Sequence, residues 1–220
     1  MATKMETEQR YVVDEAPHCK VYNDGTIMIG PVRCSYPHLF EAYQGEQSEK
    51  PKYSMVGLMP FGAEYRGAKN LLVKFIDEMI RSNKQKAIPA GNKFLRDGNL
   101  TGKDENENMF TINASEAVTR RPILRDSKRD PKTGKPRRLD PATDADVIYG
   151  GCWVNMLIRP WWMNNKHGKK VNASLIAVQK VRDDEAFGQG RVSEDDVDDE
   201  FETYDDEDGG FEDDDLGDEL

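Results

Sequence analysis

The segment 147–163, VIYGGCWVNMLIRPWWM, combines residue types and a spacing that favour contact with nucleobases. In an extended strand, successive side chains point to opposite faces. One alternate set is apolar and suits a barrel interior: Ile148, Cys152, Val154, Met156 and Ile158. The other set mixes aromatic, amide and guanidinium groups: Tyr149, Trp153, Asn155, Arg159 and Trp161. Because bases stack on aromatic rings and arginine adds cation–π contacts, the second face is a candidate stacking surface, with packing beneath a loop or helix as the alternative.

A basic cluster lies upstream, at 120–138. Nine Lys and Arg fall within these nineteen residues, opposed by Asp126 and Asp130. They are Arg120, Arg121, Arg125, Lys128, Arg129, Lys132, Lys135, Arg137 and Arg138. Such a cluster is typical of phosphate binding. The alternatives are a solvated loop and a docking site for the chain's own acidic end.

Further candidate contacts come from two short segments and one turn. They are Arg33, Tyr36, Lys52, Tyr53, Lys166 and Lys169. Arg33 alternates with Val32 and Cys34, so we expect it to face away from the core. Tyr36 is equally suited to close one end of a barrel. Lys166 and Lys169 belong to NNKHGK, whose Asn and Gly predict a hairpin turn.

Negative charge is concentrated at the C-terminal end. Residues 183–220 contain twenty Asp and Glu and one Arg, whereas residues 1–182 contain thirty Lys and Arg against twenty-one Asp and Glu. The formal net charge of −10 therefore conceals a basic body with an acidic tail. A segment as charged as this tail is expected to be disordered.

Signatures of catalysis, metals and cofactors are missing from the sequence. PKTGK lacks the upstream Gly and the following Ser or Thr of a phosphate loop. The acids between 97 and 107 lie among Gly and Asn, which favours a solvated loop over a nuclease metal site, and the three cysteines lack zinc-site spacing. We therefore expect no enzyme, no metal and no cofactor. The chain has no apolar run of about 18 residues and no signal peptide, which predicts a cytoplasmic protein without membrane contact.

The elements that position these residues are expected to be mainly strands. The predicted strands are 26–40, 52–61, 109–115, 117–124, 147–163 and 169–182. Apolar residues at three- and four-residue spacing predict one amphipathic helix over 64–86, between the second and third strands. A bend is expected at Gly30-Pro31, because proline cannot donate to a ladder. The polar excursion 126–146 is expected to be mobile.

This order of elements favours a small β-barrel over a parallel α/β fold. We expect three parts in the chain. They are a loose N-terminal arm at 1–25, a nucleic-acid-binding domain at 26–182 and the disordered acidic tail at 183–220.

Several of these segments together resemble a known family. GGCWVNMLIRPWWMNNKHGKKVNASLIAVQKVRDDEAFGQG, RCSYPHLFEAY and KYSMVGLMP are similar to bacteriophage-encoded single-stranded DNA-binding proteins with an acidic C-terminal tail. The resemblance implies a mainly β OB fold, a five-stranded barrel that coats single strands in phage replication, recombination and repair. The host bacterial cytoplasm would be its location. A looser resemblance connects it to the single-strand binders of short-tailed coliphages, whose tails contact polymerase and helicase.

With that resemblance, the tail is expected to compete with DNA for the groove and to recruit replication proteins. Its apolar anchors would be Phe201, Tyr204, Phe211, Leu216 and Leu220. The basic cluster leaves duplex DNA open as a second ligand, and pairing of strand edges would give a homodimer. Alternative functions are a strand-annealing recombination mediator, an acidic DNA mimic that binds basic proteins, and a metal-dependent nuclease.

Overall fold

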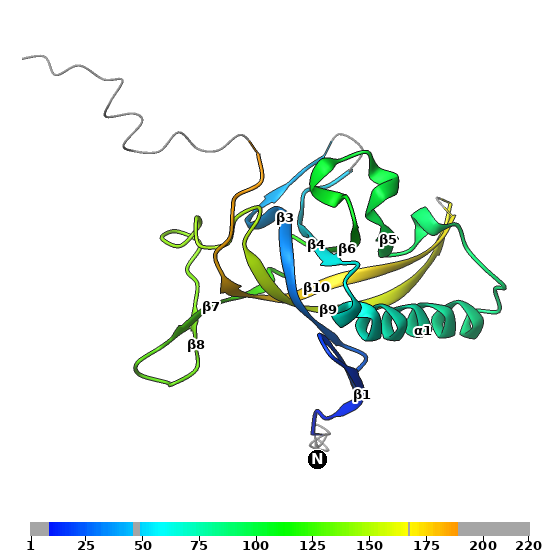
Figure 1. The fold of residues 1–220 in the computed structure, drawn as a ribbon, viewed down its shortest axis with the longest axis horizontal. Coiled ribbons are helices and arrows are strands. Elements are labelled where there is room, and N and C mark those ends of the chain that lie inside the picture. The colour runs from blue at the N-terminus through cyan, green and yellow to red at the C-terminus, as the bar shows by residue number, and fades with distance from the viewer. Residues whose placement is uncertain (1–8, 46–48, 167, 189–220) are drawn as a thin grey trace, which may run out of the picture. The chain divides into compact units, whose positions relative to one another are not determined.

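Five strands pair in a closed ring in the computed structural model, which describes residues 9–45, 49–166 and 168–188. In pairing order they are β3 (Ile27–Tyr43), β4 (Lys52–Pro60), β6 (Met109–Ala117), β10 (Gly168–Arg182) and β9 (Trp153–Asn165), which returns to β3. Every contact in the ring is antiparallel except that between β6 and β10. This closed order is the OB fold, as the family resemblance implied. The twisted strands can be followed in Figure 1.

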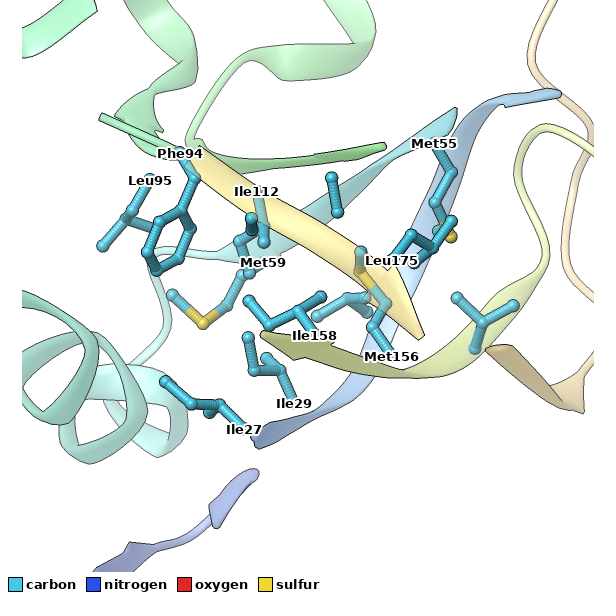
Figure 2. Close-up of a cluster of buried hydrophobic side chains, with 14 of the residues drawn as sticks. Ile27, Ile29, Met55, Met59, Phe94, Leu95, Ile112, Met156, Ile158 and Leu175 are labelled. Carbon is cyan, nitrogen blue, oxygen red and sulfur yellow. The ribbon is translucent and has the colours of Figure 1, made fainter. Parts of the chain in front are cut away.

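The barrel interior is apolar and contains side chains from every strand of the ring. Figure 2 shows some of them directed toward one another: Ile27, Ile29, Met55, Met59, Ile112, Met156, Ile158 and Leu175. The alternation predicted for β9 is confirmed on this side, because Val154, Met156 and Ile158 have no exposed surface. Ile148 and Cys152 are also buried, in the turn that precedes the strand.

Helix α1 (Arg66–Ser82) lies between β4 and β6, as predicted. Its buried face joins the barrel core and consists of Ala68, Leu71, Leu72, Ile76 and Ile80. The helix is shorter than the predicted 64–86. A 3₁₀ turn (Ala63–Tyr65) precedes it, and the left-handed backbone of Lys84, at φ 57°, ends it.

Residues 12–22 are more ordered than the loose arm expected at 1–25. They form a hairpin of β1 (Val12–Ala16) and β2 (Cys19–Tyr22), and β2 pairs with β3. The turn between the two strands contains His18 at φ 66°, a conformation in which hairpin turns usually place Gly or Asn. No glycine therefore signals this turn in the sequence.

The excursion expected to be mobile at 126–146 is instead structured. β7 (Ile123–Arg129) pairs in parallel with β10 and antiparallel with β8 (Pro136–Arg138). The β7–β8 hairpin extends away from the barrel in Figure 1. A short β5 (Leu95–Asp97) pairs with β6, and 3₁₀ turns occupy Ala90–Asn92, Gly98–Thr101 and Asp104–Asn106.

The bend predicted at Gly30-Pro31 coincides with a break in the register between β3 and β9. Gly30 has φ 145°, and a Cβ there would lie 2.5 Å from the Asn155 side chain, so only glycine fits. The compact unit that contains the barrel ends at Phe187, which places 183–187 with the barrel. Among the described residues, no helix is long and apolar enough to cross a membrane.

Candidate nucleic-acid interface

Outward-facing side chains of neighbouring strands lie in two adjacent rows across the barrel. Strand register aligns one row, which consists of Arg159 (β9), Ser174 (β10), Ser115 (β6) and Ser54 (β4). In the next row Trp161 pairs with Asn172, and Asn113 pairs with Val56. The rows therefore bring aromatic, amide, hydroxyl and guanidinium groups onto one face.

Two hollows follow these rows. The first is lined mainly by Tyr36, Ser54, Val56, Asn113, Ser115 and Asn172. The second is lined by Glu116, Arg120, Arg121, Ile123, Arg159, Ser174, Leu175 and Ile176. They adjoin, because Ser115, which lines the first, pairs with Ser174, which lines the second. We call the two hollows together the groove; it crosses the face of the barrel on which OB folds bind oligonucleotides.

Tyr36 lies at one end of the groove, and contacts with Lys103 and Glu105 fix its side chain. Its backbone has φ 48°, at a break in the pairing of β3 with β4, and its side chain is 48% exposed. Lys103 Nζ donates to Tyr36 Oη at 2.6 Å and lies 4.0 Å from the ring centre, while Tyr36 Oη donates to Glu105 Oε1 at 3.2 Å. A bulky residue with positive φ costs roughly 1–3 kcal/mol and is often retained at binding sites. Trp161, 42% exposed, is the second aromatic beside the groove.

Cations from separate segments meet at the second hollow. Arg120 pairs with buried Glu116 at 2.8 Å and keeps a side chain that is 73% exposed. The Arg159 side chain is 51% exposed, and its guanidinium lies 3.9 Å from the Asp24 carboxylate. Lys52 is exposed and points to the same side of β4 as Ser54, beside the groove but outside the residues that line it. These side chains place positive charge in and beside the second hollow.

Arg121 reaches the second hollow, but its neighbour Tyr53 does not face solvent. Tyr53 is only 8% exposed, because it alternates with Lys52 and points inward. Arg121 Nε donates to Tyr53 Oη at 3.1 Å, and Arg121 Nη2 donates to the Phe40 carbonyl at 2.6 Å. In this structure Tyr53 therefore supports Arg121 and offers no open ring for stacking.

The predicted stacking surface on β9 is divided. Tyr149 precedes the strand, which begins at Trp153. Tyr149, Trp153 and Arg33 all contact residues 183–187, which cover this end of β9. Asn155 is half-buried, with its side-chain amide 3.4 Å from Gln179 Oε1. Arg159 and Trp161 therefore face the groove side, whereas the other three members of the predicted face do not form an open surface.

The basic cluster is also divided. Exposed cations on the β7–β8 hairpin are Lys128, Arg129, Lys132, Lys135 and Arg138. Arg125 is half-buried, and its guanidinium donates to the Leu124 carbonyl. Arg137 instead bridges Asp126 at 2.9 Å and Asp144 at 3.0 Å. Arg137 thus fixes the hairpin and is not free for phosphate.

We expect Arg137→Met to lower stability more than DNA affinity. Burial acts to raise the pKa of Asp126, but the hydrogen bonds from Arg137 and from backbone amides outweigh it, and the pKa is lowered. A carboxyl with a lowered folded-state pKa stabilises the fold above its unfolded-state pKa, near 4, and loses that effect as pH falls. The melting temperature should drop by several degrees at pH 7, and the difference from the unchanged protein should shrink below about pH 4. An equal drop in melting temperature at pH 7 and below about pH 4 would contradict this role. Lys128→Met, which removes an exposed cation from the same hairpin, is the control.

One sequence comparison decides the family. The model described as "Enterobacter phage Enc34, ssDNA-binding protein" matches residues 25–210. The chain belongs to this family. The single-stranded DNA-binding protein of bacteriophage Enc34, solved in complex with single-stranded DNA, is 36% identical, with a TM-score of 0.71 over 83% of this chain and 100% of that chain.

A further structure of the Enc34 protein and one protein from another phage also match the chain. A C-terminal truncation of the Enc34 protein matches with the same identity and TM-score, over 83% of this chain and 99% of that one. Protein p50 of Acyrthosiphon pisum secondary endosymbiont phage 1 is 29% identical over 175 residues, which is 76% of this chain and 89% of p50. The family consists of DNA-binding proteins, which agrees with the expectation that this chain is not an enzyme.

Some groove residues of this Enc34-family chain were missed from sequence. Asn113, Ser115, Asn172 and Ser174 alternate with buried residues in two strands, a polar pattern that could have marked an exposed face. Lys103 had no local signal, because it reaches Tyr36 across 67 residues.

The remaining predicted sites belong to the β9–β10 turn and to the acidic tail. Lys166 is exposed in the β9–β10 turn, and Lys169 donates to Gln85 Oε1 at 2.8 Å. The tail anchors Phe201, Tyr204, Phe211, Leu216 and Leu220 lie outside the described residues. Within the described part of the chain, no group of three His, Cys, Asp or Glu side chains could hold a metal ion.

Proposed function

We propose that this protein binds single-stranded DNA along the groove, without a fixed base sequence. The observation that carries the proposal is the alignment of Tyr36 and Trp161 with amides, hydroxyls and cations from four strands. Aromatic rings accept any base, and a line of cations follows the phosphates. The Enc34 relative, solved with single-stranded DNA, supports the same ligand class.

In this proposal, different groove residues contact different parts of the DNA strand. Tyr36 and Trp161 stack bases, while Asn113 and Asn172 donate to or accept from sugar and base edges between them. Arg120, Arg121, Arg159 and Lys52 bind phosphates, and the exposed cations of the β7–β8 hairpin extend the positive surface beyond the second hollow. Duplex DNA lacks the unstacked bases that the rings would accept, so we expect weaker duplex binding through the cations alone.

The tail adds regulation in this proposal. Residues 188–220 contain seventeen Asp and Glu against one Arg, a charge able to compete with DNA for a basic groove. DNA binding would release the tail, whose apolar residues would then recruit replication, recombination and repair proteins. A homodimer of this protein stays a prediction, and sedimentation velocity would test it.

A salt titration tests the proposal. Binding of fluorescent oligo-dT should weaken linearly in log–log form as salt rises, and Lys52→Gln with Arg159→Gln should reduce the slope by about 1.4, or about 0.7 per lost phosphate contact. Lys20→Gln with Arg81→Gln removes the same charge from exposed positions that do not line the groove and serves as the control. Equal slopes for the groove and control variants would contradict the proposed path, and tighter binding of duplex than of oligo-dT would contradict the ligand class.

A further inference from the structure

Residues 183–187 occupy a seat at the start of β9, formed by Arg33, Trp153, Arg182 and Tyr149. The Asp184 carboxylate accepts a hydrogen bond from Trp153 Nε1 and lies 3.9 Å from Arg33 Nε and 3.7 Å from Arg182 Nη1. The Trp153 hydrogen bond, with a backbone amide and the two arginines, lowers the pKa of Asp184. The seat therefore holds an anion between an indole N–H and two guanidinium groups.

The same seat also holds an aromatic ring. The Arg33 guanidinium lies 4.4 Å from the centre of the Phe187 ring, and Arg33 Nη2 donates to the Glu185 carbonyl at 2.6 Å. The Phe187 amide donates to the Gly150 carbonyl at 2.9 Å. Gly151, at φ 110°, lets this segment approach, because a Cβ there would collide with the Glu185 carbonyl.

The seat thus binds an anionic group and an aromatic ring side by side. A nucleotide presents the same two groups, a phosphate and a base. A phosphate would take the place of the Asp184 carboxylate, and a base would take the place of the Phe187 ring. Trp153 stands on the same outward face of β9 as Arg159 and Trp161, which line or border the groove. Eight residues of strand separate Trp153 from Trp161, on the order of 26 Å, so a strand leaving the groove along β9 would reach the seat.

We propose that the seat is a second single-stranded DNA subsite, which residues 183–187 occupy while no DNA reaches it. The inference rests on the proposed groove function. The seat would add binding surface that only longer strands reach. Short strands fill the groove and leave the segment in place. Longer strands displace Asp184 and Phe187 and gain the contacts that these residues had made.

The test compares oligo-dT of increasing length on full-length variants. Asp184→Asn with Phe187→Ala should leave affinity for short oligonucleotides unchanged and tighten long ones about tenfold, the effect of roughly one stacked base. Adding Trp153→Ala should remove that gain. Glu15→Gln with Tyr11→Ala removes one acid and one aromatic ring from exposed positions outside the groove, the seat and the tail, and is the matched control.

Each outcome has a defined meaning. A gain confined to long oligonucleotides and to the seat variant supports the subsite, whereas an equal gain in the control variant or no gain at all overturns it. If the unchanged protein does not bind oligo-dT, the proposed function fails and the subsite with it. Should the seat variant lose its fold, hydrogen exchange on the unchanged protein decides: the Phe187 amide should lose protection with long but not short oligo-dT, and constant protection overturns the inference.

Discussion

Tyr36→Ala combined with Trp161→Ala is expected to weaken oligo-dT binding a hundredfold or more. Each ring offers an exposed face beside the first hollow, and alanine substitution of a stacking aromatic typically costs about 1–3 kcal/mol. The two effects should be roughly additive if each ring stacks a different base. Fluorescence anisotropy at fixed salt measures the loss, and circular dichroism confirms the fold.

Tyr11→Ala is the matched control for this pair. Tyr11 is 60% exposed on the N-terminal side of β1, outside the residues that line the groove. If the double variant keeps its affinity with an intact fold, the bases do not stack at Tyr36 and Trp161. Trp153→Ala alone should change the affinity for short oligonucleotides little, because Asp184 and Arg182 cover that ring.

The second large effect is expected on removing the tail. A chain that ends at Phe187 should bind single strands about tenfold or more tightly at low salt and should show a steeper salt dependence, because seventeen competing acids are removed. The cut belongs after Phe187 and not after Arg182, since residues 183–187 contact the barrel. Binding isotherms from low to moderate salt measure both quantities.

The same measurements on the truncated chain could also exclude competition by the tail. Unchanged affinity and slope in the truncated chain would exclude competition and leave recruitment as the tail's role. A tail of the same length with its Asp and Glu replaced by Asn and Gln separates charge from chain length. It should behave like the truncated protein if charge is the cause.

Periodicity predicted the five ring strands and the helix, because each follows from a local pattern of apolar residues. The strand predicted at 117–124 is wrong, since β6 ends at Ala117, a turn follows and β7 begins at Ile123. β9 and α1 have the buried faces that their spacing indicates. The β1–β2 hairpin was missed because its turn uses His18 where glycine is usual. The β7–β8 hairpin was missed because its order depends on Arg137 bridging Asp126 and Asp144, a contact that no periodicity reveals.

The candidate site was predictable only where strand alternation decides it. Arg159 and Trp161 follow from the period of β9, and the same period in β4 excludes Tyr53 once Lys52 faces outward. The position of Trp153 beneath Asp184 could not be predicted, since it depends on how the chain turns after β10. Tyr36 was ambiguous from sequence, and its partner Lys103 lies 67 residues away.

The parallel contact of β10 with β6 has a consequence for how the protein is made. β10 is the last strand of the ring, and it supplies both the pairing that shuts the barrel and the centre of the groove. A growing chain that has not yet reached β10 has neither a complete core nor a complete groove, because pairings between distant segments form late. The barrel and the groove are thus completed by the same strand, the last one of the ring to be synthesised.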